Sequence, residues 1–227
     1  MSTFLAPAAV RDRINEIREQ LPPTVRLIAV TKAVPTDLMR AAYATGVRDF
    51  GESRLQEALT KQAELSDLPD ITWHLIGHLQ RNKAAKAMQH FQWIHAIDSL
   101  KLAQHLEQIA QQQGFSPNLC LQVKFRPDPA KYGWSVAELS ADLPTLDRCT
   151  HLAIRGLMTI LPQGLSETAI AATFQQAKAF STKLQQHPWS HLRFTELSMG
   201  MSGDYPLAVA AGATMIRLGR CLFGERT

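Results

Sequence analysis

The feature that most constrains the fold is a regular alternation of short apolar segments with helix-like stretches along most of the 227 residues. The apolar segments are rich in β-branched and aromatic residues, and several end at turn residues. Such an alternation predicts a parallel sheet covered by helices. We expect strands at Val25–Thr31, Val47–Phe50, Thr72–Ile76, Trp93–Ile97, Asn118–Phe125, Leu152–Leu157, Phe194–Leu197 and Thr214–Leu218.

Helices are predicted before and between these strands. A leader helix from Pro7 to Leu21 places apolar residues at helical spacing, and Pro22-Pro23 ends it. Ser53 and Ser99 are the types of residue that cap helix N-termini. The helices between strands are expected at Thr36–Thr45, Ser53–Leu65, Asn82–Gln89, Ser99–Gln113 and Ser166–His187.

Eight strand–helix units predict a single (β/α)8 barrel of the TIM type with an additional N-terminal helix, spanning residues 1–227 as one domain. An open doubly wound sheet is the alternative. No Gly-x-Gly-x-x-Gly follows the first strand, which weakens the dinucleotide-binding form of that alternative.

Composition excludes several classes of protein. The net charge is +4, but no Lys/Arg run has the length of a nucleic-acid patch, and no apolar run has the length of a membrane span. The 3 cysteines lack a Cys-x-x-Cys spacing, which is typical of reduced thiols in a cytoplasmic protein. His74 and His78 are four residues apart, but Gly77 lies between them, in a strand-to-loop segment and not a helix that could align both rings on a metal. We therefore expect no metal site, and the charge and apolar patterns above predict no nucleic acid and no membrane partner.

Lys32 ends the first predicted strand, and active sites of such barrels form at the C-terminal ends of the strands. Desolvation by the barrel wall would lower the pKa of this lysine, and a neutral amine attacks aldehydes. The alternative is a lysine that points to water. His74, on the third predicted strand, either lines the mouth of the barrel or packs within it.

An anion site is predicted next to Lys32, because the first and last strands of a closed barrel are neighbours. Ser202 lies in a glycine-containing loop after the seventh strand, and Gly219 and Arg220 follow the eighth. Loops at these positions often bind phosphate in such barrels. Arg217, inside the last strand, needs a partner when buried. That partner is either a ligand group or, in a purely structural role, Glu196 or Asp204.

Several motifs make the chain resemble the pyridoxal phosphate homeostasis protein family (YggS or PROSC type), which is similar to the N-terminal barrel of alanine racemase. The motifs are Ala29–Lys32, Phe50–Ser53, Trp73–Lys83, Gly156–Ile160, Leu197–Asp204 and Ile216–Gly219.

The resemblance implies a barrel like that of fold type III pyridoxal enzymes, with pyridoxal 5'-phosphate (PLP) held as a Schiff base on Lys32. Arg217 would face the pyridine nitrogen, and Ser202, Gly219 and Arg220 would surround the phosphate. In the family an Asn-Tyr pair usually stands where this chain has Ser53 and Arg54. The shorter Ser53 is then expected beside the cofactor ring.

A charged arginine facing the ring nitrogen keeps that nitrogen unprotonated and weakens carbanion chemistry. We therefore expect a monomeric cytoplasmic carrier or buffer in PLP homeostasis, with no catalytic residues and with apo-enzymes as candidate recipients. The resemblance also leaves a small PLP-dependent racemase as an alternative, although the chain stops after the eighth predicted strand. A sugar-phosphate barrel enzyme that forms a Schiff base is a third possibility.

Overall fold

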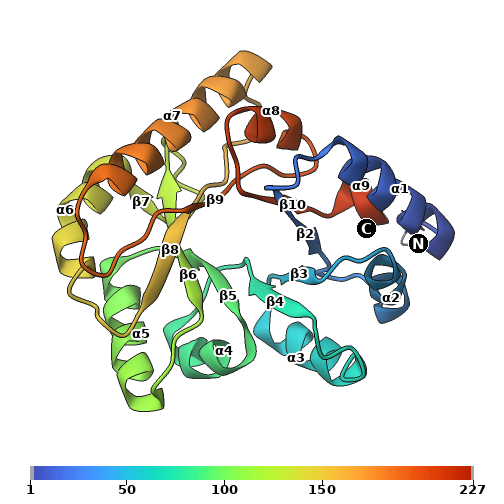
Figure 1. The fold of residues 1–227 in the computed structure, drawn as a ribbon, viewed down its shortest axis with the longest axis horizontal. Coiled ribbons are helices and arrows are strands. Elements are labelled where there is room, and N and C mark those ends of the chain that lie inside the picture. Colours follow the sequence, from blue (N-terminus) through green and yellow to red (C-terminus); the bar gives the residue numbers. More distant parts are fainter. Residues whose placement is uncertain (1–2, 226–227) are drawn as a thin grey trace.

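The computed structural model describes residues 3–225, and these form a closed barrel of parallel strands surrounded by helices (Figure 1). The barrel strands, in chain order, are β2 (Arg26–Val30), β3 (Asp49–Glu52), β4 (Thr72–Leu75), β5 (Trp93–Ile97), β6 (Asn118–Lys124), β8 (Ala153–Met158), β9 (Glu196–Ser198) and β10 (Met215–Leu218).

The pairing of β5 with β6 closes the barrel, and the pairing of β2 with β10 joins its first and last strands. The sheet order is β5-β4-β3-β2-β10-β9-β8-β6, and β5 also pairs with β6. The first and last barrel strands are therefore neighbours, with Arg217 of β10 opposite Ile28 of β2. The predicted barrel is confirmed, and the open doubly wound sheet is wrong because such a sheet would leave two unpaired edges.

Helices form the outer layer (Figure 1). The leader helix α1 (Pro7–Gln20) precedes the first barrel strand and packs against α2 and α9. The remaining helices are α2 (Thr36–Ala44), α3 (Leu55–Glu64), α4 (Ala84–His90), α5 (Leu100–Gln113), α6 (Val136–Leu146), α7 (Glu167–Gln186), α8 (Tyr205–Ala210) and α9 (Arg220–Phe223), with a 3₁₀ turn, η1 (Arg81–Lys83), before α4.

Three short strands lie outside this pattern. β1 (Thr3–Phe4) pairs antiparallel with β11 (Gly224–Glu225), so the two ends of the described chain lie together. β7 (Trp134–Ser135) extends the sheet beside the end of β6. Within residues 3–225, no helix is both long and apolar enough to cross a membrane.

The strands separate two regions of apolar packing. The larger region lies between the strands and the helices, and includes Ala29 of β2 and Phe50 of β3. A smaller cluster contains only strand residues, as expected for side chains that alternate to the interior of a barrel. Its members are Ile28, Trp93, Ala96, Cys120, Met158 and Met215.

Local signals placed one helix start correctly and one incorrectly. The Ser99 hydroxyl accepts a hydrogen bond from the Leu102 N–H, as predicted for the N-cap of α5. Ser53 is not the N-cap of α3, because the helix begins at Leu55 and Arg54 occupies the cap position without a side-chain bond. The backbone of Ser53 instead lies against Gly77, where an added Cβ would come 2.2 Å from the Ser53 carbonyl oxygen.

Candidate functional site at the C-terminal end of the barrel

Lys32 lies just beyond the C-terminal end of β2 and is exposed. The strand ladder continues to its neighbour, because the Thr31 N–H donates to the Gly51 carbonyl at 2.9 Å. The chain then turns sharply: the Val34 N–H donates back to the Thr31 carbonyl, and Ala33 has a left-handed φ of 59°. Lys32 is thus presented at the mouth of the barrel by a fixed turn.

A buried polar cluster on the outer side of β2 holds this turn. The Lys61 Nζ atom, on α3, donates to the Thr31 carbonyl oxygen at 2.6 Å, to Glu52 Oε1 at 2.9 Å and to Glu57 Oε1 at 2.6 Å. The Thr31 hydroxyl also donates to Glu52, and the Ala33 N–H donates to Glu57. Both residues that flank Lys32 are therefore bonded to one cluster, which we call the Lys61 cluster (Thr31, Glu52, Glu57 and Lys61).

The two carboxyl groups of the Lys61 cluster differ in their electrostatics. Burial raises the pKa of the Glu52 carboxyl, and its Oε2 atom has no hydrogen-bond partner in the described structure. Burial also raises the pKa of Glu57, but hydrogen bonds from Lys61 and Ala33 outweigh it and leave that pKa below its usual value. Sequence reasoning missed this cluster, although the Glu57 and Lys61 spacing of four residues on a predicted helix could have indicated the pair.

Arg217 lies inside the barrel near the end of β10 and is 4% exposed. Its Nη1 atom donates to the Ser198 hydroxyl oxygen at 2.7 Å, and its Nη2 atom donates to the Thr159 carbonyl at 2.8 Å. Burial lowers the pKa of Arg217 to about 10, so the side chain is still charged at neutral pH.

Of the two partners considered for Arg217, the structural alternative of an ion pair with Glu196 or Asp204 does not describe its contacts. Glu196 accepts a hydrogen bond from the Thr214 hydroxyl at 2.7 Å, and Asp204 accepts one from the Met201 N–H at 2.6 Å. The buried guanidinium is held by a hydroxyl and a carbonyl instead.

The predicted anion-binding loops meet at Ser202. The Ser202 Oγ atom accepts hydrogen bonds from the backbone N–H groups of Gly219, at 3.2 Å, and Cys221, at 3.4 Å. Because this oxygen already accepts twice, its own proton is directed to another acceptor. The Gly219 N–H, in one of the predicted phosphate-binding loops, thus donates to Ser202.

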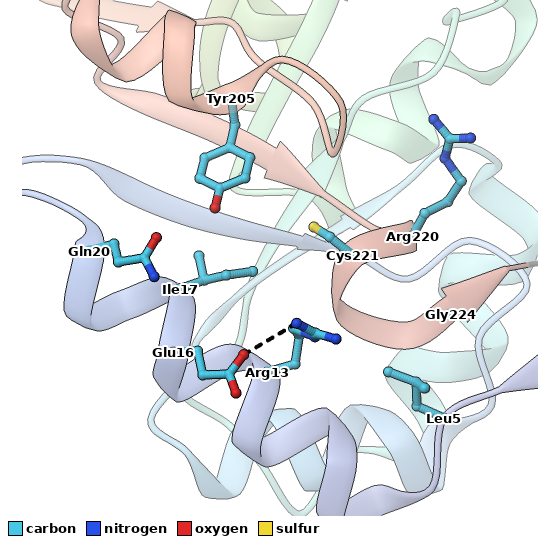
Figure 2. A pocket seen from close by; sticks show the side chains of 9 residues that line it. All are labelled: Leu5, Arg13, Glu16, Ile17, Gln20, Tyr205, Arg220, Cys221 and Gly224. Carbon is cyan, nitrogen blue, oxygen red and sulfur yellow. Dashed lines mark hydrogen bonds and ion pairs between the residues drawn. The ribbon is translucent and has the colours of Figure 1, made fainter.

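Arg220 follows Gly219 and opens α9, where its side chain is exposed. It borders a groove of about 440 Å³ that Tyr205, Cys221 and Ile17 also line. Figure 2 shows Arg220 extending away from Tyr205 and Cys221. The groove lies on the outer side of the barrel, against α1, and neither Lys32 nor Arg217 lines it.

His74 and Ser53 differ in their surroundings. His74 is fully buried inside the barrel, with Nε2 2.9 Å from Asp49 Oδ1 and Nδ1 2.9 Å from His95 Nε2. Of the two expectations for His74, the packed and hydrogen-bonded one describes these contacts. Ser53 lies at the C-terminal edge of the barrel, directly after β3. Contact of either residue with a ligand stays a prediction.

A second polar pair stands at the same rim. The His78 Nδ1 atom lies 2.8 Å from Asp98 Oδ2, and the Tyr132 ring stacks on the His78 ring with 3.8 Å between centroids. These residues follow β4, β5 and β6, on the side of the mouth away from β9 and β10. The mouth therefore combines an exposed lysine, a buried charged arginine and a serine hydroxyl held by two backbone N–H groups.

Comparison with known proteins agrees with this geometry. Residues 5–227 match the family described as "Alanine racemase, N-terminal domain". The pyridoxal phosphate homeostasis protein of Synechocystis sp. (strain PCC 6803) is 52% identical over 93% of this chain and 96% of that protein. This chain belongs to the pyridoxal phosphate homeostasis protein family. The member from Escherichia coli K12 is 33% identical over 96% of this chain and 94% of that protein, and the resemblance found in the motifs is confirmed.

Solved structures give the same result. PipY of Synechococcus elongatus PCC7942, solved with PLP bound, is 56% identical and superposes with a TM-score of 0.90 over 95% of this chain and 100% of that one. An alanine racemase of Clostridium difficile in complex with cycloserine gives a TM-score of 0.77 at 14% identity over 96% of this chain and 60% of that one. The second likeness concerns the fold alone.

Proposed function

We propose that this chain, as one domain of residues 1–227, binds PLP at the C-terminal mouth of the barrel and acts in cytoplasmic PLP homeostasis. It holds the cofactor through the amine of Lys32 and releases it to apo-enzymes that require it. In this role the protein is a carrier or buffer without robust catalysis.

The observation that carries the proposal is the pairing of β2 with β10. Leu218 lies opposite Ala29, so Lys32, beyond β2, and Gly219, beyond β10, emerge at the same edge of the barrel. An amine and an anion-binding loop at one edge match a ligand with an aldehyde and a phosphate.

The residues at this edge fit the groups of PLP. When bound, PLP supplies an aldehyde that bonds to an amine and a ring that withdraws electrons. Lys32 provides the amine, and the Ser202 hydroxyl, with Gly219 and Arg220 beside it, provides the anion site. Arg217 is a donor only, so it satisfies an unprotonated ring nitrogen and opposes its protonation. That arrangement favours storage of the cofactor over carbanion chemistry.

The test is to identify the lysine that bonds to PLP. The protein is loaded with PLP, reduced with borohydride, digested and analysed by mass spectrometry. We expect the modification at Lys32, its loss in Lys32→Ala, and no change in Lys83→Ala, a matched control because Lys83 is an exposed lysine of the same rim. Reduced adducts on Lys83 or Lys131 in place of Lys32 would contradict the assignment.

The alternative, a small amino-acid racemase, is tested on the same preparations. Racemisation needs acid and base groups on both faces of the cofactor. The protein is incubated with L-alanine, D-alanine is followed by chiral chromatography, and transfer is measured by reactivation of an apo-enzyme. We expect reactivation without D-alanine. D-alanine formation that disappears in Lys32→Ala would favour the racemase.

A further inference from the structure

A continuous chain of buried hydrogen bonds crosses the interior of the barrel. Arg217 Nη1 lies 2.7 Å from Ser198 Oγ, which lies 2.9 Å from His95 Nδ1. His95 Nε2 lies 2.9 Å from His74 Nδ1, and His74 Nε2 lies 2.9 Å from Asp49 Oδ1. The five residues come from five different barrel strands, and Ser198, His95 and His74 are fully buried.

The two ends of the chain determine where its protons lie. Arg217 can only donate, so Ser198 Oγ accepts from it and turns its own proton toward His95 Nδ1. His95 then carries its proton on Nε2 and donates to His74 Nδ1. His74 in turn carries its proton on Nε2 and donates to the Asp49 carboxylate, which only accepts. With both rings neutral, every contact has one donor and one acceptor, all in the same direction.

A second proton on either ring breaks this order. Protonated His74 would present an N–H to the N–H of His95 across 2.9 Å, unless the protons of His95 and Ser198 also reversed. Ser198 would then face two donors, one of them Arg217. Burial acts in the same direction, because it lowers the pKa of His74 and lowers that of His95 well below its usual value.

Asp49, the last residue of the hydrogen-bond chain, begins β3 and so lies at the end of the barrel opposite to Lys32. The Asp49 side chain is 22% exposed, and Arg26 Nε lies 3.8 Å from its Oδ1 atom. The Trp93 ring stacks parallel to the His74 ring, with 6.0 Å between centroids. The Arg26 guanidinium lies over the Trp93 ring, with Cζ 5.2 Å from its centroid. Trp93 thus packs against both histidines, and the Asp49 carboxylate, which ends the hydrogen-bond chain, also faces the Arg26 side chain.

We propose that His95 and His74 are positioning residues, which act through Ser198 to hold Arg217 as an oriented, charged donor at the mouth of the barrel. The inference rests on the proposed function in one respect, namely that the group facing Arg217 is the ring nitrogen of PLP. Among residues 3–225, no carboxylate forms an ion pair with Arg217, and the hydrogen-bond chain joins it to the carboxylate of Asp49 through Ser198, His95 and His74. In this role the two histidines act through Ser198 and not by direct contact with the ligand.

The first test uses the wild-type protein without PLP. Long-range proton–nitrogen NMR spectra of histidine-labelled protein report which ring nitrogen carries the proton. We expect both His74 and His95 as neutral Nε2–H tautomers from pH 6 to pH 8, with His95→Phe and His74→Phe spectra used for assignment. An Nδ1–H tautomer or a protonated ring at either position would overturn the proposed order. This readout holds even if PLP were not the ligand.

The second test is a double-mutant cycle on PLP affinity. His95→Phe should weaken PLP binding by on the order of tenfold, because it removes one link to a charged donor. In an Arg217→Leu background the same change should add little, since it acts through Arg217. Leu119→Val, a buried change on β6 in the larger apolar region and away from the hydrogen-bond chain, serves as the control for general loosening of the barrel and should leave affinity within about twofold.

The outcomes separate the two proposals. Borohydride trapping at Lys32 should persist in His95→Phe. If the wild-type protein is not trapped at Lys32, the proposed function is refuted, and the NMR result on the histidine tautomers still stands. Equal weakening by His95→Phe in the presence and absence of Arg217 would overturn the positioning role while leaving PLP binding intact. Circular dichroism of each variant identifies any that fail to fold, and the wild-type NMR experiment then decides.

Discussion

At the scale of single residues, Ser202 joins the two loops that form the proposed anion site. Its oxygen accepts two backbone N–H groups, from Gly219 and Cys221 after β10, and these bonds fix the position of the oxygen. A hydrogen bond from this hydroxyl to a phosphate would have a charged acceptor, and such bonds contribute more to binding than bonds between neutral groups.

Removing this hydroxyl should weaken binding of the phosphorylated ligand more than binding of the unphosphorylated one. In Ser202→Ala we expect PLP affinity to fall by on the order of tenfold, because a hydrogen bond to a charged group contributes about 1.5–3 kcal/mol. Binding of unphosphorylated pyridoxal should be nearly unaffected. Both affinities can be measured by absorbance titration, with Ser140→Ala, on the exposed side of α6, as the control. Equal losses for the two ligands would place Ser202 away from the phosphate.

Glu52 should make stability depend on pH in the direction opposite to most carboxylates. Its pKa is raised by burial, so the folded protein binds this proton more tightly than the unfolded chain does. Its contribution is therefore complete below about pH 4.3, the ordinary value for glutamate, and declines as pH rises through the raised pKa.

Chemical denaturation of the wild type and Glu52→Gln across this range tests the sign. Glutamine mimics the protonated acid and does not titrate. The free energy of unfolding of the wild type, relative to Glu52→Gln, should fall from pH 4 to pH 7. A constant or rising difference would show that Glu52 stays ionised in the folded protein without cost.

At the scale of secondary-structure elements, α3 is bonded to the end of β2 by one buried amine. Lys61 reaches from the helix to the Thr31 carbonyl and to Glu52 at the end of β3. The turn that carries Lys32 is thus tied to the helix of the following unit. Buried ion pairs of this kind give little net stability, but breaking one leaves uncompensated charge behind.

Lys61→Met keeps the apolar stem and removes the charge. We expect a loss of about 3–5 kcal/mol in the free energy of unfolding, because Glu52 and the Thr31 carbonyl lose their buried partner. Lys83→Met, at an exposed position in η1, should change stability by no more than about 0.5 kcal/mol. Guanidinium denaturation measures both. A Lys61→Met protein as stable as the wild type would mean that the cluster reorganises or admits water.

The elements themselves were largely predictable from local patterns, whereas their contacts across the barrel were not. Trp93–Ile97 was predicted to the residue because its apolar run is bounded on both sides, and Pro7 and Pro22 delimit the leader helix to within one residue. Ser53 is not the cap of α3, and its backbone lies against Gly77, a residue distant in sequence that no local pattern brings to it. Which interior side chains meet depends on strand register and barrel closure, which no local pattern encodes.

The same division applies to the site. Lys32, Ser202 and Gly219 could be placed from strand ends alone, because every parallel strand of a barrel ends at one rim. The bonds between His74 and His95 and between Arg217 and Ser198 join residues from different strands across the interior. They require the closed barrel to be known before they can be found.

At the scale of the whole molecule, the described surface offers little for a stable homodimer. Within residues 3–225, the large apolar side chains that are exposed are Phe115, Tyr132 and Met201. Phe115 precedes β6, whereas Tyr132 and Met201 lie in loops at the opposite end of the barrel, after β6 and β9. Homodimer interfaces are more apolar than the rest of a protein surface and bury large contiguous areas. Separated apolar residues of this kind do not form such a patch.

We therefore expect a monomer. Multi-angle light scattering coupled to size exclusion should give the mass of a single chain over a range of micromolar concentrations, with and without PLP. The comparison with PLP matters because the mouth of the barrel carries both Tyr132 and Met201, and a ligand there could change which of them is covered. A mass of two chains that persists on dilution would contradict the expectation. It would also indicate that polar contacts, rather than an apolar patch, hold the two copies together.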